Sequence, residues 1–226
     1  MLYVLFILLL LSWFIYVKLK LKKPSLLALI FKVSTTSLII IYALVAIRYN
    51  LNVISLGLIV VMSLIFGLLG DIFLDLKLIY KSDDLFYTYA GFYSFIFGHV
   101  LYGIYFLLQY RLGYIEILCL IVASLLFTVL VLLTEKPTKL NYGKFRPIVC
   151  AYAFILSFVT LLVFWVALSN KQSSLLIFGY GMLAFIVSDL ILSQSYFGEQ
   201  EKKWMIISNY IFYYGAQFLI AFALVN

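Results

Sequence analysis

The chain has 226 residues, of which 66% are hydrophobic and 11% are charged, and its mean hydropathy is +1.17. Soluble domains carry about 25% charged residues, so this composition excludes a soluble globular protein and predicts an all-α membrane protein. The formal net charge of +7 indicates contact with anionic membrane lipids, and no segment resembles a nucleic-acid-binding module.

Eight apolar segments are long enough to cross a bilayer, which takes about 20 residues in a helix. They lie at 2–17, 25–47, 53–76, 85–108, 113–133, 147–168, 173–195 and 205–225. The first has no basic residue before it and a lysine cluster after it, which predicts a retained helix rather than a cleaved signal peptide. The connections are short, so we expect one domain of eight transmembrane helices over residues 1–226.

The basic residues predict the orientation of the chain. The connections after the first, third, fifth and seventh segments hold twelve of the sixteen Lys and Arg residues. Because basic connections stay in the cytoplasm, we expect these four connections there and both termini on the other side. The abundance of Ile, Lys, Phe and Tyr is typical of a bacterial protein, so the predicted location is the bacterial inner membrane.

Two aspartates lie inside apolar segments: Asp71 in GDIFLDL and Asp189 in FIVSDLILS. An ionisable group at that depth costs roughly 2.5–3.5 kcal/mol on insertion scales, and it marks a functional site by default. Asp75, one turn after Asp71 on the same face, lies nearer the connection, so we expect a solvated acid there.

The rise of about 1.5 Å per residue in a helix gives the depth of the polar side chains. Four of them fall in one layer on the order of 10 Å inside the cytoplasmic boundary: Lys32, Asp71, Tyr152 and Asp189. Three more are predicted to lie deeper, nearer the bilayer centre: His99, Tyr102 and Gln217.

An internal repeat is predicted from matching patterns in the two halves of the chain. The pattern small-Asp-apolar-apolar-Leu occurs at 70–74 and again at 188–192. Each aspartate is followed 28 residues later by a buried-type polar residue, His99 or Gln217. A basic residue and a proline also open both the second and the sixth segment. These patterns predict a four-plus-four parallel repeat with a pseudo-two-fold axis along the membrane normal.

Four motifs in sequence order resemble one known family. They are GDIFLDL, FxxxHVLY at 95–102, SDLIL followed by Phe197, and YYGAQFLIA at 213–221, with an early Lys-Pro at Lys23. Over nearly its whole length the chain resembles the YhhN-like lysoplasmalogenase family. This resemblance implies a membrane hydrolase that cleaves the vinyl ether bond of lysoplasmalogens, releasing a fatty aldehyde and a glycerophospho-ethanolamine or -choline. It also implies that the paired intramembrane acids of the family are Asp71 and Asp189.

Vinyl ether hydrolysis needs an acid to protonate the β-carbon, a negative charge beside the resulting cation, and one water molecule. Two carboxylates in low dielectric supply these functions, because one stays protonated while the other is ionised. We therefore expect Asp71 and Asp189 to be catalytic without a metal or other cofactor, on a lysophospholipid with one ether-linked chain. Seven residues are predicted to bind the substrate: Lys23, Lys32, His99, Tyr102, Tyr152, Tyr214 and Gln217.

Alternatives remain open from the sequence. The acids and Lys32 can form a purely structural network, or Lys32 can extend its ammonium group to the membrane surface. His99 can join the two acids in a metal site, although a single histidine is sparse for zinc. A small proton-coupled transporter and a non-catalytic lipid-binding protein are the alternative functions.

Overall fold

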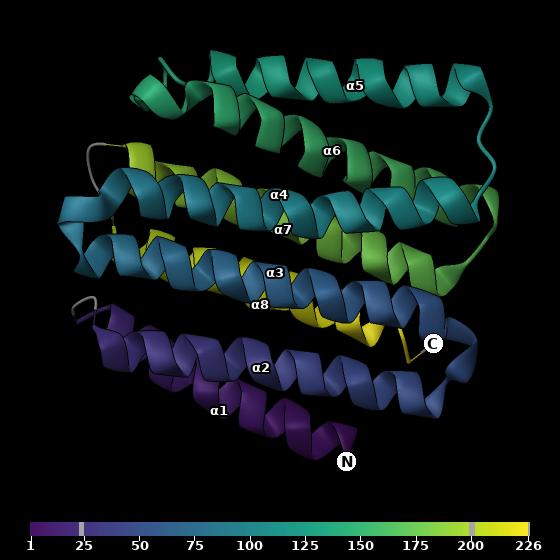
Figure 1. The fold of residues 1–226 in the computed structure, drawn as a ribbon, viewed down its shortest axis with the longest axis horizontal. Coiled ribbons are helices and arrows are strands. Elements are labelled where there is room, and N and C mark those ends of the chain that lie inside the picture. The colour runs from purple at the N-terminus through teal and green to yellow at the C-terminus, as the bar shows by residue number, and fades with distance from the viewer. Residues whose placement is uncertain (23–24, 199–201, 226) are drawn as a thin grey trace. The chain divides into compact units, whose positions relative to one another are not determined.

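The structure is a computed structural model that describes residues 1–22, 25–198 and 202–225. These stretches contain eight helices that are long and apolar enough to cross a membrane, and no β-strand (Figure 1). The all-α, eight-helix fold class is therefore confirmed, and the chain is a multi-pass integral membrane protein.

The helix bounds lie within three residues of the predicted segments. The helices are α1 (Leu2–Lys20), α2 (Leu26–Tyr49), α3 (Ile54–Ile79), α4 (Asp84–Gln109), α5 (Tyr114–Leu133), α6 (Arg146–Ser169), α7 (Ser173–Phe197) and α8 (Lys203–Phe222). Short 3-10 turns at Leu51–Val53, Lys81–Asp83 and Gly143–Phe145 lead into α3, α4 and α6.

Local sequence explains how several helices begin. The Ser25 hydroxyl accepts a hydrogen bond from the Ala28 amide at 3.2 Å and caps α2. At the start of α5, a Glu116 carboxylate oxygen accepts from the Gly113 amide at 2.6 Å. A proline, Pro147, occupies the first turn of α6, where its missing N–H has no helical partner to lose.

The chain divides into two compact units, one of Met1–Gly98 with Ala221–Asn226 and one of His99–Ile220. The division falls inside α4. The single domain expected over residues 1–226 stays a prediction. In the first unit α2 packs against both α1 and α3, and buried Tyr16, Ile39 and Val60 contribute to its core (Figure 1).

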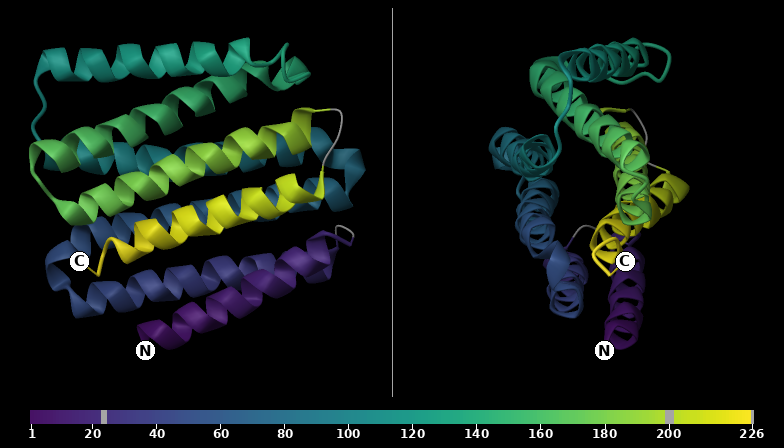
Figure 2. Two further views of the ribbon diagram at one scale, coloured as in Figure 1. Left: turned by 180° about the vertical axis from the view of Figure 1, so that it is seen from behind. Right: turned by 90° about the vertical axis from the view of Figure 1, so that its right-hand side faces the viewer.

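In the second unit α6 packs against both α5 and α7, and α8 lies beside α7 (Figure 2). Phe106, Phe178 and Met182 are fully buried in its core. The approach of α7 and α8 is close at Gly181, where a Cβ atom would lie 2.9 Å from the Ala216 carbonyl oxygen. A glycine at position 181 therefore permits this packing.

The connection between α5 and α6 is fastened to the end of α7. The Asn141 amide donates to the Phe197 carbonyl at 2.9 Å, and the Phe197 ring meets the rings of Tyr142 and Phe145 at 5.1 and 6.0 Å. The Tyr142 amide in turn donates to Glu135 at 3.0 Å. Phe197, singled out as part of the SDLIL motif, thus has a packing role outside the predicted site.

Candidate functional site

Asp71 lies in a buried cluster of charged side chains in the first unit. Lys32 and Asp71 are 4% and 3% exposed, and the Lys32 ammonium is 3.0 Å from one Asp71 carboxylate oxygen. The Thr36 hydroxyl, one turn after Lys32 on α2, donates to the other oxygen at 3.5 Å. The ion pair with Asp71 shows that Lys32 pairs with an acid, as one interpretation of the sequence predicted, and its predicted contact with the substrate stays a prediction.

Asp75 belongs to the same cluster, and the expectation of a solvated acid was wrong. It is 4% exposed, its carboxylate accepts from the Lys20 ammonium at 2.8 Å, and Lys32 lies 3.5 Å away. The reason is that α1 continues to Lys20, beyond the predicted end at 17, and brings a cation to the level of Asp75. A narrow crevice lined by Lys20, Ser25 and Asp75 among others has no room for a water molecule.

Sequence reasoning assigned Lys20 to a cytoplasmic connection and so missed its contact with Asp75. A signal was present, because Ser12, Tyr16 and Lys20 follow one another at four-residue intervals on the buried face of α1. The cluster of Lys20, Lys32, Asp71 and Asp75 carries two positive and two negative groups and is formally neutral.

Asp189 lies in the second unit in a different polar setting. It is half-buried on α7 and accepts a hydrogen bond from the hydroxyl of Tyr152 on α6. The Tyr152 oxygen is also 3.5 Å from the Nε2 atom of His99 on α4. The predicted residues Tyr152, His99 and Asp189 therefore come together.

His99 is 4% exposed and is surrounded by aromatic rings. Its ring meets Phe185 edge-on at 4.9 Å, and the Tyr102 ring lies 6.2 Å away. The Phe185 ring meets that of Tyr213 at 5.3 Å, and the Tyr213 hydroxyl accepts from the Gln217 amide at 2.7 Å. A continuous group of side chains thus connects His99 to Gln217, and Tyr102 lies at its edge.

The remaining predicted residues lie elsewhere. Tyr214 is 3% exposed and contacts the rings of Tyr210 and Tyr213, and its predicted contact with the substrate stays a prediction. Lys23 lies outside the described residues. Among the residues that the structure describes, no group of three or more His, Cys, Asp or Glu side chains could hold a metal ion.

Asn209 on α8 is a positioning residue that sequence reasoning missed. It is 3% exposed, and its amide nitrogen donates to the Ser188 carbonyl at 2.8 Å and lies 3.0 Å from the Ser188 hydroxyl. Because Ser188 directly precedes Asp189, these bonds fix the backbone that carries the acid. A buried-type amide inside an apolar segment was the available signal.

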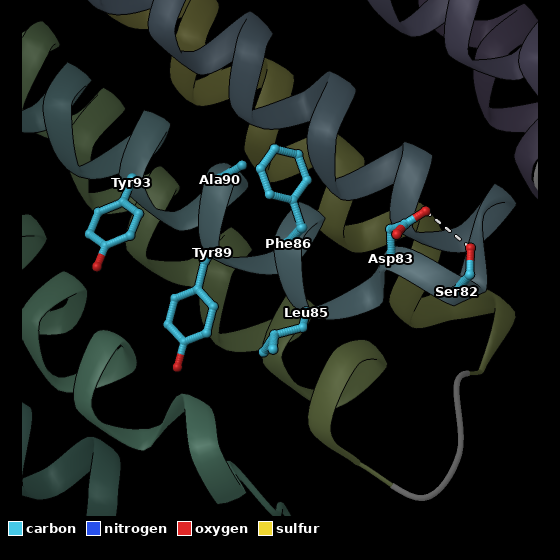
Figure 3. A pocket seen from close by; sticks show the side chains of 7 residues that line it. All are labelled: Ser82, Asp83, Leu85, Phe86, Tyr89, Ala90 and Tyr93. Carbon is cyan, nitrogen blue, oxygen red and sulfur yellow. Dashed lines mark hydrogen bonds between the residues drawn. The ribbon is translucent and has the colours of Figure 1, made fainter.

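A shallow groove of about 560 Å³ follows the first turns of α4 (Figure 3). Its lining comprises Ser82, Asp83, Leu85, Phe86, Tyr89, Ala90 and Tyr93. Phe86 and Tyr93 are more than half exposed, as expected of aromatic side chains near a membrane surface. The groove contains none of the predicted site residues.

A comparison with models of protein families matches residues 27–224 to the YhhN family. This chain belongs to the YhhN family. The match spans both units and includes the two intramembrane aspartates. Searches of curated proteins and of solved structures gave no match. Family membership confirms the resemblance inferred from the four motifs.

Proposed function

We propose that this YhhN-family protein is a membrane hydrolase that cleaves the vinyl ether bond of lysoplasmalogens. Family membership and two aspartates within membrane-spanning helices support the proposal. The observation that carries it is the difference between the two acids: Asp71 has a lysine partner, whereas Asp189 has a tyrosine partner. Vinyl ether hydrolysis needs such a difference, because one acid has to be protonated and the other ionised.

The partners suggest which acid has which role. The Lys32 ammonium 3.0 Å from Asp71 stabilises the ionised carboxylate. Asp189 accepts from the Tyr152 hydroxyl, a neutral group that stabilises an ionised carboxylate less than an ammonium group does. We therefore assign Asp189 as the general acid and Asp71 as the carboxylate that stabilises the cation and orients water.

In the proposed reaction the carboxyl group of Asp189 gives its proton to the β-carbon of the vinyl ether, and the double bond electrons form the new C–H bond. The resulting oxocarbenium ion is stabilised by the Asp71 carboxylate. Water adds to the positive carbon and passes a proton to the ionised Asp189. The hemiacetal then breaks the bond between its carbon and the glycerol oxygen, and its hydroxyl proton passes to that oxygen, so the products are an aldehyde and an alcohol. Atoms and charges balance without a metal or cofactor.

The proposed substrate is a lysophospholipid with one ether-linked chain, in the bacterial inner membrane. Its contacts are proposed to come from Lys23, Lys32 and the second-unit residues His99, Tyr102, Tyr152, Tyr214 and Gln217. Because the reaction uses both acids on one substrate molecule, loss of either should stop it. This requirement makes the function testable by substitution.

The test is mass spectrometry of fatty aldehyde released from lysoplasmalogen by purified protein. Asn preserves the shape of Asp but cannot donate a carboxylic proton or carry a charge. Asp71→Asn and Asp189→Asn should each lower the rate by about 10²–10⁴-fold. The double variant should be little worse than either single one, because groups that act on one step are non-additive.

Asp83→Asn is the matched control, because this exposed acid bonds only its neighbour Ser82 among the described contacts and should leave the rate unchanged. Absence of aldehyde from the wild-type protein would refute the function. Loss of activity on chelation with recovery on adding zinc would refute the two-acid mechanism and favour a metal site at His99.

A further inference from the structure

Three side chains from three helices form a series that ends at Asp189, the proposed acid. Tyr152 on α6 donates its hydroxyl proton to the Asp189 carboxyl group on α7. The Tyr152 oxygen lies 3.5 Å from His99 Nε2 on α4, which is close to the outer limit of a hydrogen bond. All three residues belong to the second unit. We call them the triplet, and through it α4 and α6 can act on the acid.

The direction of the two contacts follows from the protons available. A tyrosine hydroxyl has one proton and two acceptor lone pairs. Because Tyr152 gives this proton to Asp189, its oxygen accepts from His99. A neutral imidazole carries its proton on one nitrogen, and the acceptor beside Nε2 assigns the proton to that nitrogen. The Nδ1 atom has no hydrogen-bond partner among the described residues. His99 therefore donates to Tyr152, and Tyr152 donates to Asp189.

Packing holds both donors in place. His99 and Tyr152 are 4% and 8% exposed, so bulk water does not compete for their hydrogen bonds. The His99 ring meets the Phe185 ring edge-on at 4.9 Å and lies 5.8 Å from the Tyr152 ring. Asn209 fixes the backbone of residue 188, directly before Asp189. The donors and the carboxyl group are thus in position before a substrate binds.

The charge of Asp189 changes in the proposed step. When its proton leaves for the β-carbon, a negative charge forms on the carboxylate. A hydrogen bond to a charged acceptor is roughly twice as strong as one to a neutral acceptor. The bond from Tyr152 therefore strengthens while the charge forms, and a donor that is already in position lowers the barrier to proton transfer.

We propose that Tyr152 and His99 are positioning residues that stabilise the negative charge of Asp189 as this acid releases its proton. Tyr152 acts directly on the carboxylate, and His99 acts more weakly through the Tyr152 hydroxyl, because hydrogen bonds in series polarise one another. Both residues keep their own protons, so the proton balance of the reaction is unchanged. This role rests on the proposed function. It is distinct from a contact with the lipid, which acts on substrate binding.

Steady-state kinetics of aldehyde release separate this role from a substrate contact. Tyr152→Phe should lower kcat roughly 10- to 100-fold, because it removes a hydrogen bond to a charged group. His99→Phe should lower kcat less, since its bond is longer and acts through Tyr152. The matched control is Tyr142→Phe, because this tyrosine is also buried, packs against Phe197 outside the site and should leave kcat unchanged. An unchanged kcat in Tyr152→Phe would overturn the proposal, whatever its KM.

A second measurement needs no turnover. His99 is the only histidine in the sequence, so nitrogen NMR of protein with isotope-labelled histidine, in lipid bilayers, reports on the triplet alone. The wild-type spectrum should show a protonated Nε2 and an unprotonated Nδ1. Asp189→Leu removes the acceptor of the Tyr152 proton, so it should shift the Nε2 resonance by more than its line width. In Tyr152→Phe the same Asp189→Leu substitution should leave Nε2 in place, because the connecting hydroxyl is absent.

The integrated His99 signal also gives the amount of folded protein to which kcat is referred, so a variant that folds poorly does not imitate a loss of kcat. A proton on Nδ1 in the wild type, or equal shifts of Nε2 with and without the Tyr152 hydroxyl, would overturn the proposal while aldehyde release still supports the hydrolase. No aldehyde from the wild-type protein, with a shift that depends on Tyr152, would refute the proposed function and keep the donors that stabilise charge on Asp189.

Discussion

Lys32 is the residue on which the charge balance of the first unit depends. Its ammonium group is within 3.5 Å of both Asp71 and Asp75, and all three side chains are 5% exposed. Removing one member of a buried ion pair leaves an uncompensated charge, which costs more than the pair itself contributes. Lys20 alone cannot compensate for two carboxylates.

Lys32→Met should therefore lower the free energy of unfolding by roughly 3–5 kcal/mol. The measurement is the decrease in the thermal unfolding midpoint in detergent. Asp71→Asn in the same chain removes the excess negative charge and should restore much of the loss. Lys77→Met is the matched control, because its partner Asp84 has a side chain that is 44% exposed. An ion pair in which water reaches one partner this freely contributes less than a buried pair, at most about 1 kcal/mol. Equal effects of the two lysine substitutions would contradict the prediction.

At this scale the sequence identifies the unusual residues better than their partners. Asp71 and Asp189 stand out because a carboxylate in an apolar segment is costly, and Tyr152 follows from its depth. Lys20 and Asp75 were misjudged because helix ends are uncertain by a turn, and one turn of α1 decides whether this lysine reaches Asp75. Asn209 was missed because its role depends on a neighbouring backbone carbonyl, which sequence does not reveal.

At the level of helix pairs, α3–α4 and α7–α8 have matching contacts. In the first unit a Cβ atom at Gly98 would lie 3.1 Å from the Ser63 carbonyl, and in the second a Cβ atom at Gly181 would lie 2.9 Å from the Ala216 carbonyl. Position 63 lies 118 residues before position 181, and position 98 lies 118 residues before position 216. The two aspartates are separated by the same 118 residues. The same two positions of the predicted repeat thus make a close contact with a backbone carbonyl of the neighbouring helix in both halves.

The residue before each aspartate continues this correspondence. A Cβ atom at Gly70 would lie 2.6 Å from the Phe95 ring on α4, and Ser188 accepts from Asn209 on α8. Each aspartate also contacts the preceding long helix, Asp71 through Lys32 and Asp189 through Tyr152. The four-plus-four repeat stays a prediction, and these contacts are the structural observations that favour it.

The close approach of α7 and α8 predicts a sharp difference between two glycines. Gly181→Ala adds a Cβ atom 2.9 Å from the Ala216 carbonyl, so the helices must move apart and the protein should lose about 1–3 kcal/mol of stability. Gly215→Ala is the matched control, because no atom lies within 4 Å of the added Cβ. It should be neutral or stabilise by up to about 1 kcal/mol through helix propensity. Thermal unfolding measures both, and similar midpoints would contradict the packing.

For the molecule as a whole, the eight helices and their order were predictable, because a bilayer fixes the length and apolarity of each segment. The two compact units were not, because the division falls inside α4 and depends on which helices share contacts. The orientation follows from charge alone. If all eight described helices cross the membrane, both termini are expected on the same side, and the positive-inside rule predicts which side that is.

This orientation can be tested with single cysteines after Cys119 and Cys150 are replaced by serine. Exposed, uncharged positions are available in alternate connections, so the substitutions leave the distribution of basic residues unchanged. An impermeant thiol reagent added to intact cells should label Asn52→Cys and Ser169→Cys. It should label Ser82→Cys and Thr138→Cys only after the cells are permeabilised, because their connections carry Lys77, Lys136 and other basic residues that stay in the cytoplasm. The reverse pattern would invert the topology and place both aspartates near the opposite leaflet, from which the lipid substrate would then have to enter.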